Sequence, residues 1–381
     1  IIAKFYEICG LFYRDTMEKS QNGTKGKRLT ALDVMRGITI VGMIIVNNAG
    51  GSESYAALRH SDWNGLTPCD LVFPFFLFIM GITTYLSLAK NGFRAGSGTI
   101  RKILRRTLII LLICWGLHWF DNLCSGRGFF DFGHLRLTGV LTRIALCYCA
   151  VSLLALYTSR RAMACIAAVL LALYGAALLI FNGYCNDLTN VNAIVDRALM
   201  SVDHLYTKRP VDPEGLLGTI PAIAHTIIGF CCGAMLRSDR PLAERLLALM
   251  VAATVMMTAG YLLSGIMPVN KRVWSPSYVL VSCGMAAALL ATLSWFIDIK
   301  GYGRYFEFFR AFGVNPLFLY VGSEALAVII GSTGTKTAAY GAIASVVPDA
   351  CLASAIYSVG LMLLMGIPAI ALYRRKIYIK I

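Results

Sequence analysis

The chain contains ten apolar segments, and each is close to the length of a membrane-spanning helix. About 20 consecutive apolar residues cross the hydrocarbon core of a bilayer as an α-helix. Inside hydrocarbon, every backbone N–H and C=O group has to be hydrogen-bonded within the protein, so repeated segments of this length fold as a bundle of helices. We therefore predict an all-α, polytopic integral membrane protein with about ten transmembrane helices. The expected spans are residues 30–49, 69–89, 103–120, 137–157, 163–182, 216–236, 246–265, 277–297, 314–332 and 349–373.

Composition supports this assignment and bears on the partners. Hydrophobic residues make up 57% of the 381 residues and charged residues 14%, whereas a soluble domain carries about 25% charged residues. The net charge of +15 would suggest nucleic acid as the partner of a soluble protein. Here we attribute it to the excess of Lys and Arg that cytoplasmic loops carry. We expect the lipid bilayer as a partner, and no nucleic acid.

The basic residues are distributed unequally between alternate loops. One set of loops, taken with both ends of the chain, holds 22 Lys and Arg residues, and the other set holds 9. Because cytoplasmic loops are the richer ones, both termini are predicted to be cytoplasmic. The expected organisation is a cytoplasmic segment over residues 1–28, a transmembrane domain over residues 29–373 and a cytoplasmic tail over residues 374–381. Residues 1–16 are kept out of the fold, because Met17 begins a basic stretch typical of a cytoplasmic start.

The polar loop between the first two spans, with the residues that flank it, carries the densest set of functional groups. Histidine accepts and returns a proton near neutral pH and can carry an acyl group. Asparagine amides can stabilise an oxyanion, an aspartate can orient the imidazole or hold a sugar hydroxyl, and a tryptophan can stack on a sugar ring. An interfacial loop, anchored by Trp and capped by Asp, is the alternative interpretation. The residues concerned are His60, Asn47, Asn48, Trp63, Asn64 and Asp70.

Five ionisable residues within the spans need a partner or a cavity, because charge is costly in hydrocarbon. Asp33 and Arg36 are three residues apart and are expected to form an ion pair at the cytoplasmic end of the first helix. Arg143 lies roughly two turns into the fourth span and is expected to face a polar cavity. We expect His225 to make a helix–helix contact rather than to act as a catalyst. Glu324 is also within a span.

The cysteines form no metal-binding pattern, and no metal is expected. Cys124 and Cys185 fall in outer loops and could pair, but their spacing alone does not show it. The longest outer loop, residues 183–215, is polar and is either part of a lid or a solvated connector. The N-x-Ser/Thr acceptor at Asn22 falls on the cytoplasmic side. This favours the bacterial inner membrane as the location, because surface and lysosomal proteins of animals usually carry such acceptors in outer loops.

Six segments resemble, in order, those of the heparan-α-glucosaminide N-acetyltransferase family, which includes bacterial NagX-type proteins. The longest is HSDWNGLTPCDLVFPFFLFIMG, and together they extend from about Leu32 to Ala325. The resemblance implies a membrane-bound acyltransferase, an acetyl-CoA-dependent N-acetyltransferase. Its co-substrate would be cytoplasmic acetyl-CoA, and its acceptor an amino sugar such as glucosamine, or a related glycan, on the other side. The other segments are LDVMRGITIVGMIIVNN, HLRLTGVLTRIALCY, DPEGLLGTIPAI, NKRVWSPSYVL and FGVNPLFLYVGSE.

The resemblance also implies roles for single residues. The active-site histidine of the family falls on His60, and the aspartate that opens the second span falls on Asp70. The asparagine after the first span falls on Asn47. The loop between Asn47 and His60 is slightly longer than in animal members, so Asn48 can take the role of Asn47. With Asn48, we expect Trp63 and Asn64 to contact the acceptor.

The acyl donor is expected to enter from the cytoplasm. The pantetheine arm of CoA can cover much of a ~30 Å hydrocarbon core, and the phosphates at its other end favour Arg and Lys. Arg36, Arg105 and Arg106 lie at the cytoplasmic helix ends and are the expected phosphate ligands. Arg143 matches the arginine of the family's motif and is expected to contact the arm, although Thr142 replaces the usual glutamine before it.

Within the transferase interpretation, we favour direct transfer of the acetyl group in a ternary complex over a covalent intermediate on His60.

Two other classes of function, a permease and a sensor, remain as alternatives. The alternative is a permease for N-acetylglucosamine or a related sugar, but such a protein is expected to bind its substrate near the membrane midplane. The polar cluster here lies at one face. A non-catalytic sensor is the third interpretation, and a homodimer is left open.

Overall fold

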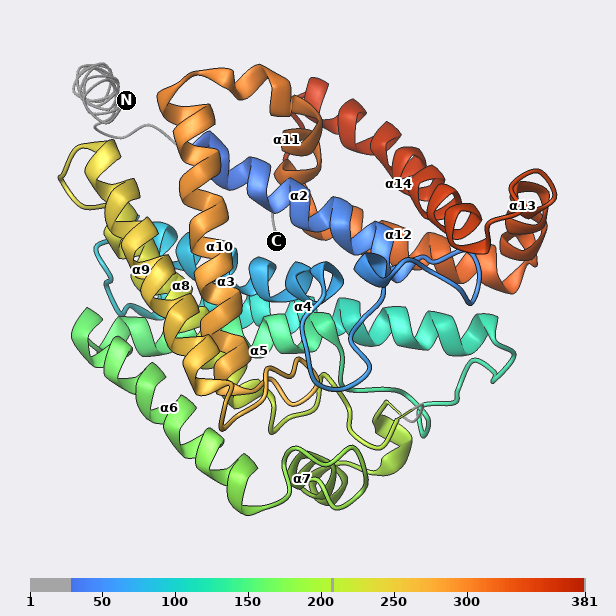
Figure 1. Cartoon of the computed structure of the whole chain (residues 1–381), viewed down its shortest axis with the longest axis horizontal. Coiled ribbons are helices and arrows are strands. Elements are labelled where there is room, and N and C mark those ends of the chain that lie inside the picture. Colours follow the sequence, from blue (N-terminus) through green and yellow to red (C-terminus); the bar gives the residue numbers. More distant parts are fainter. Residues whose placement is uncertain (1–28, 207–208, 380–381) are drawn as a thin grey trace, which may run out of the picture.

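The computed structural model describes residues 29–206 and 209–379, and the regular elements of this part are all helices (Figure 1). The expected segment 1–28 and residues 380–381 of the expected tail lie outside the described residues. The long helices are α2 (Thr30–Asn47), α3 (Pro68–Lys90), α4 (Ser97–Cys124), α5 (Val140–Tyr157), α6 (Arg160–Ile180), α8 (Thr219–Leu236), α9 (Leu242–Leu263), α10 (Pro276–Ser294), α12 (Pro316–Ser332) and α14 (Ala350–Arg374). The shorter elements are η1 (Ala56–Leu58), α7 (Val191–Leu199), η2 (Val202–His204), η3 (Trp295–Ile299), η4 (Tyr302–Phe306), α11 (Glu307–Val314) and α13 (Thr335–Ala344).

Nine helices in the described part of the chain are long and apolar enough to cross a membrane. The segments Tyr302–Val314 and Pro316–Ser332 are bent by 71° at their junction and make a tenth span if they are counted as one broken span. The span expected over residues 314–332 corresponds to α12 alone, which is continuous, and the bend lies just before it. The bend lies at Asn315, because a residue that precedes a proline is disfavoured in the α conformation. The predicted all-α, polytopic membrane fold is confirmed.

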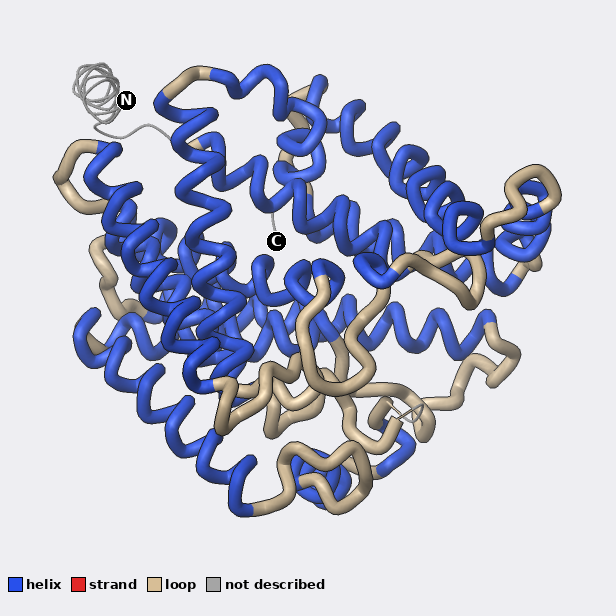
Figure 2. The backbone as a smooth tube through the Cα atoms, in the orientation of Figure 1, coloured by secondary structure: helices blue, strands red, loops and turns tan. Residues whose placement is uncertain are grey.

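Successive helices place their connections on two opposite faces of the bundle, and the longest loops gather on one side (Figure 2). We call this side the His60 face. Its loops contact one another across the chain, as when the backbone N–H of Leu137 donates to the carbonyl of His204. By the alternation of the helices, the His60 face comprises the described residues 48–67, 125–139, 181–206, 209–218, 264–275 and 333–349. The opposite face comprises residues 91–96, 158–159, 237–241, 295–306 and 375–379.

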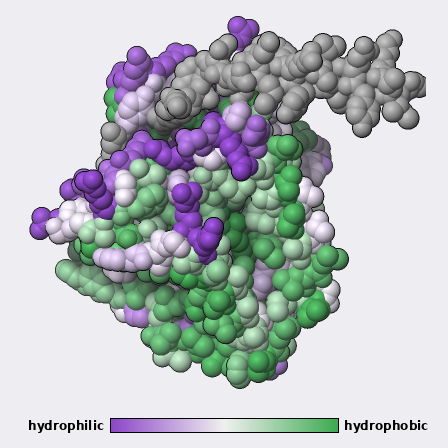
Figure 3. Space-filling model, turned by 90° about the vertical axis from the view of Figure 1, so that its left-hand side faces the viewer, coloured by the Kyte–Doolittle hydropathy of each residue, from purple (hydrophilic) through white to green (hydrophobic). Residues whose placement is uncertain are grey.

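The helices divide into an inner and an outer group. Within their most apolar windows, α8 is 72% buried and α2, α3 and α10 are each 61% buried, whereas α4 and α9 are only 22% buried. A helix that is apolar on its exposed side belongs in lipid. Figure 3 shows hydrophobic side chains over most of one face of the molecule and hydrophilic ones gathered at its upper side. The outer helices therefore provide the lipid-facing surface.

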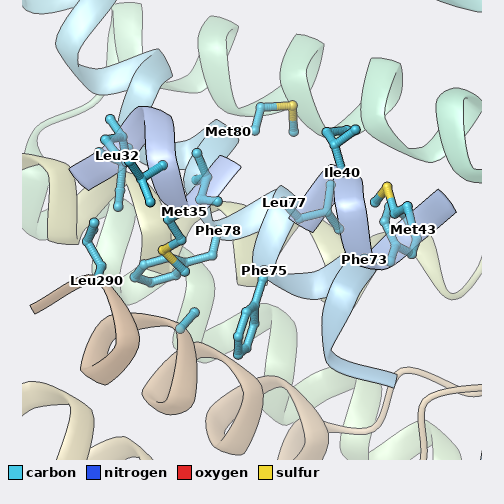
Figure 4. Packing of buried hydrophobic residues seen from close by; sticks show 14 of the residues in the cluster. Leu32, Met35, Ile40, Met43, Phe73, Phe75, Leu77, Phe78, Met80 and Leu290 are labelled. Atoms are coloured by element: carbon cyan, nitrogen blue, oxygen red, sulfur yellow. The ribbon is translucent and has the colours of Figure 1, made fainter. Parts of the chain in front are cut away.

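Buried side chains of α2, α3 and α10 interdigitate in the centre (Figure 4). Met35 from α2, Phe78 from α3 and Leu290 from α10 are fully buried in one cluster. Packing of this kind, rather than exclusion of water, holds helices together in lipid. It fixes α3, the helix that follows the His60 loop.

The inner helices α3 and α8 approach each other through glycines. A Cβ atom added to Gly81 would lie 2.2 Å from the carbonyl oxygen of Thr226, and one added to Gly229 would lie 2.3 Å from the carbonyl oxygen of Phe78. Small residues at such crossings let the two backbones meet. The contact therefore depends on both glycines.

A proline inside α3 adds a second tie between the inner helices. Pro74 has no N–H group, so the carbonyl of Asp70 lacks its usual partner one turn later. The hydroxyl of Tyr278 on α10 donates to that carbonyl over 2.7 Å. Nε2 of His225 on α8 lies 2.9 Å from the carbonyl oxygen of Pro74, which confirms the expected helix–helix contact of this histidine.

Asp33 and Arg36 on α2 also form the expected ion pair, at 3.3 Å.

The glycine crossing gives a first prediction. Gly229→Ala should destabilise the protein by roughly 1–3 kcal/mol, as overpacking does, because its new methyl group would meet a backbone carbonyl. The matched control is Gly116→Ala on α4, where an added Cβ meets nothing within 4 Å. Thermal unfolding in detergent should separate the two variants. Equal melting temperatures for both would contradict the close packing of α3 and α8.

Candidate functional site

Three loops of the His60 face are tied together around His60. The indole N–H of Trp63 donates to the carbonyl oxygen of Tyr184 over 2.7 Å, and the backbone N–H of Gly65 donates to that of Val269 over 2.8 Å. The side chain of Asn64 accepts a 3.0 Å hydrogen bond from Asn270. The loop that carries His60 is therefore held on both sides by segments more than 100 residues away in sequence.

Asp70 fixes the imidazole of His60. Its side chain is fully buried in the first turn of α3, and its Oδ1 lies 2.8 Å from Nδ1 of His60. Its Oδ2 accepts the backbone N–H groups of Ser61 and Thr67, each at 3.1 Å. A carboxylate only accepts hydrogen bonds, so we assign the Nδ1 proton to the imidazole and leave Nε2 as the proton acceptor. The side chain of His60 is 45% exposed, so Nε2 can meet a substrate.

Lys271 is the charged residue of this site that the sequence analysis missed. Its Nζ lies 3.0 Å from Nδ1 of His60 and 3.6 Å from Oδ1 of Asp70. Burial lowers the pKa of Lys271, and the nearby Asp70 opposes this change. The segment NKRVWSPSYVL was noted only for its resemblance. A basic residue in a loop is first interpreted as part of the charge bias that orients a membrane protein, not as a catalytic group. No local spacing could connect it with His60, which is 211 residues away.

The two asparagines that end the first span do not contact His60. Nδ2 of Asn48 donates to the carbonyl of Ile44 in its own helix over 2.8 Å, so this side chain closes the end of α2. Nδ2 of Asn47 donates to Oε1 of Glu324 on α12 over 2.9 Å. A role for Asn47 or Asn48 in oxyanion stabilisation stays a prediction, and substrate would have to bring the groups together.

The expected acceptor ligands Trp63 and Asn64 differ in their surroundings. Asn64 is exposed, and its amide oxygen is held by Asn270. Trp63 is half-buried and packs against a small apolar cluster that includes Tyr174 and Val273. Part of the indole surface is therefore used for packing rather than left for a sugar ring.

Arg143 does not face a cavity. Its helix α5 begins at Val140 rather than near residue 137, so Arg143 is in the first turn and not two turns deep. It is 1% exposed and donates to the carbonyl oxygens of Pro213 and Gly215 over 2.8 and 2.9 Å. Its guanidinium also lies 5.0 Å from the ring centre of Trp274. In the structure, Arg143 anchors the long loop of the His60 face.

A cavity of about 600 Å³ lies between α2, α3, α4, α5 and α12. Arg36 and Arg106 both line it, while Arg105 is exposed beside it. The guanidinium of Arg106 lies 4.6 Å from the ring centre of Tyr148, another lining residue. Pockets of roughly 300–1,000 Å³ are typical of small-molecule and cofactor sites. Two of the expected phosphate ligands thus share one cavity, which reaches the opposite face.

Helix α3 connects this cavity with His60. Its lining residues run from Leu88 at the opposite face to Phe76, about 18 Å along a helix that rises 1.5 Å per residue. Cys69 continues the same stripe two turns beyond Phe76, and its Sγ lies 3.1 Å from Nδ1 of His60. One rigid helix therefore carries the cavity wall and, at its other end, Asp70.

The described parts of the long loop, residues 183–206 and 209–215, pack onto this face. It includes α7 and makes ion pairs from Asp212 and Glu214 to Arg136, at 3.2 and 2.9 Å. Cys124 and Cys185 are free. Among the described residues, no group of three or more His, Cys, Asp or Glu side chains could hold a metal ion.

The fold and the site define an all-helical, multi-pass membrane protein. A half-exposed histidine held by a buried aspartate lies at one face, and a cavity lined in part by Arg36 and Arg106 reaches the other. A family model described as heparan-alpha-glucosaminide N-acetyltransferase, catalytic, matches residues 28–241. Heparan-alpha-glucosaminide N-acetyltransferase of Homo sapiens is 30% identical over 357 residues, which cover 78% of this chain and 53% of the human protein. That of Mus musculus is 30% identical over 362 residues, which cover 80% of this chain and 54% of the mouse protein. The chain belongs to the heparan-alpha-glucosaminide N-acetyltransferase family, and it spans about half the length of the curated relatives it matches.

A buried carboxylate in the long loop of the His60 face makes stability depend on pH. Asp196 on α7 is 1% exposed, and only its Oδ1 has a hydrogen-bond partner in the described part of the chain, the N–H of Leu217. Burial raises the pKa of Asp196 to about 6. Because this pKa is above that of the unfolded chain, the folded state binds the proton more tightly. Stability is therefore lost as the pH rises from about 4 to about 6.

Asp196→Asn should remove this loss. One pH unit corresponds to about 1.4 kcal/mol, so the variant should be more stable than the wild type at pH 7.5 by an amount on the order of 2–3 kcal/mol. At pH 4.5, closer to the unfolded pKa, the difference should shrink to about 1 kcal/mol. Melting temperatures in detergent at both pH values provide the comparison. An equal response to pH in the two proteins would be inconsistent with an ionisable, buried Asp196.

Proposed function

We propose that the protein is a membrane-bound N-acetyltransferase, which moves the acetyl group of acetyl-CoA to the amine of an amino sugar or related glycan. One observation carries this proposal. A single helix, α3, forms a wall of the arginine-lined cavity and ends at the His60–Asp70 pair. Two substrates that approach from opposite faces would therefore meet at one end of it. The names of the relatives support the reaction class.

The cavity suits the acyl donor. The nucleotide part of CoA carries several negative charges, and guanidinium groups match phosphate geometry. Arg106 lines the cavity, and so does Arg36, which also pairs with Asp33. From there the pantetheine arm would follow α3 past Phe76 toward His60. The inner lining is mostly apolar, with Ile79 and Ile110 among its residues, as suits an uncharged arm.

The aspartate–histidine pair suits the acceptor amine. With the Nδ1 proton held by Asp70, Nε2 of His60 would accept a proton as the amine attacks the thioester carbonyl. The C–N bond forms, the C–S bond breaks, and CoA leaves as a thiol once it takes up a proton. We favour this direct transfer over an acetyl-histidine, because a ternary complex places both substrates in one site and avoids hydrolysis.

The distribution of charge supports the sidedness of the proposal. The opposite face, with Arg36 and Arg106, is the richer in Lys and Arg and would be cytoplasmic. His60 would then face the far side of a bacterial inner membrane, and both termini would be cytoplasmic. In this arrangement acetyl-CoA remains in the compartment where it is made.

His60→Gln should abolish acetyl transfer and leave the protein folded, because a half-exposed loop side chain contributes little to packing. The measurement is transfer from labelled acetyl-CoA to glucosamine by purified protein in detergent. The melting temperature of the variant serves as the control for folding. Full activity in folded His60→Gln would exclude His60 as the base. Transport of N-acetylglucosamine by wild-type protein that transfers no acetyl group would favour a permease.

Arg106→Ala should weaken binding of CoA roughly tenfold, as loss of one charge-assisted contact would. Its matched control is Arg105→Ala, since this neighbour has the same charge but lies outside the cavity lining. Affinity of the wild type should also fall as salt is added, because salt screens a charged site. Calorimetric titration of purified protein with CoA would measure both effects. Equal affinities in the two variants would place the nucleotide elsewhere.

A further inference from the structure

The ammonium group of Lys271 lies against the imidazole of His60 rather than in line with one nitrogen. Its Nζ is 3.0 Å from Nδ1 and 3.4 Å from Nε2. An amine that donated in the ring plane to one nitrogen would be far from the other, because the two lone pairs point away from each other. Near-equal distances therefore place the cation over the ring or beside its Cε1 edge. The contact is between a charge and a ring, and the lone pair of Nε2 stays available.

The backbone around Lys271 is rigid. Asn270 is fully buried, and its side-chain oxygen accepts the N–H groups of Arg272 and Val273 over 2.8 and 3.2 Å. Its amide group reaches across to Asn64 in the His60 loop. Lys271 itself is 12% exposed. The turn closed by Asn270 is therefore hydrogen-bonded to the His60 loop, and it holds the ammonium group of Lys271 beside the imidazole.

Two opposite charges act on the imidazole. The carboxylate of Asp70, 2.8 Å from Nδ1, favours a second proton on the ring, whereas the cation of Lys271 disfavours it. Without Lys271, the buried carboxylate would favour the doubly protonated imidazolium, which cannot accept a proton. A base has to be neutral when the acceptor amine arrives. The other titratable or charged groups around this cluster are Cys69, Asp62, Glu214, Arg209 and Arg272.

We propose that Lys271 is a positioning residue whose charge, held against the ring, keeps the imidazole of His60 neutral and its Nε2 ready to accept a proton. The assignment deepens the proposed function, on which its catalytic meaning rests. It requires no contact between Lys271 and either substrate. Because the role depends on the positive charge, Lys271→Arg should preserve it and Lys271→Met should abolish it.

Protonation of His60 can be measured without any acetyl transfer. Diethyl pyrocarbonate modifies neutral imidazole, and the pH dependence of its reaction with the purified protein would be followed at His60 by peptide mass spectrometry. His60→Gln identifies the signal. In Lys271→Met, the half-maximal pH of this modification should rise by roughly one pH unit or more, as removal of a like charge within 4–6 Å predicts. In Lys271→Arg it should stay close to that of the wild type.

The pH dependence of acetyl transfer to glucosamine supplies the second readout. In Lys271→Met, the acid limb of the pH–activity profile should shift to higher pH by a similar amount. Activity should recover at high pH to within about tenfold of the wild type. Titration of the amine contributes equally to every variant and cancels in the comparison. A lower plateau with an unmoved limb would mark a merely structural role and overturn the proposal. Lys271→Gln serves in place of Lys271→Met if the latter does not fold.

The two readouts separate the inference from the function on which it rests. An unchanged modification profile in Lys271→Met would overturn the role of Lys271, whatever the activity. A shifted profile in a protein that acetylates no amine would support the electrostatic role and overturn the proposed transferase.

Discussion

The carboxylate of Asp70 has no exposed side-chain surface, and both of its oxygens accept hydrogen bonds at the boundary between a loop and a membrane helix. One oxygen closes the first turn of α3 by accepting the N–H groups of Ser61 and Thr67. The other holds His60. A buried charge is tolerated only when such partners are present, because desolvation is costly. The same group therefore begins the helix, shapes the loop and orients the imidazole, and removal of it would disturb all three.

The inner helices make this arrangement rigid. Gly81 and Gly229 bring α3 and α8 into backbone contact. Pro74 removes one hydrogen bond from α3, and Tyr278 on α10 satisfies the carbonyl that is left without a partner. A site on a helix packed in this way is held more accurately than a site on a free loop. The same helix also carries the cavity wall down to the opposite face, so the positions of the two candidate substrate sites are coupled through one rigid element.

Much of this could be predicted from the sequence, because the information is local. The length and apolarity of each segment predict the spans, and the contact of His60 with Asp70 involves residues ten apart. The bend at Asn315 is also local, although a hydrophobic run conceals it. The contacts that were not predicted are long-range. Lys271 reaches His60 across 211 residues. Arg143 was expected to contact the arm of CoA, but two of its donors bind backbone carbonyls of a distant loop.

Sidedness is the most direct test of the account, since the two substrates are assigned to opposite faces of one helix bundle. Purified protein would be placed in sealed vesicles, and the orientation of each molecule would be scored by protease access. Acetyl-CoA would then be supplied on one side only, and glucosamine on the other. The account predicts acetylation when the donor is on the Arg106 side and the acceptor on the His60 side, and none in the reverse arrangement. Acetylation only when both substrates are on the same side of the membrane would contradict it.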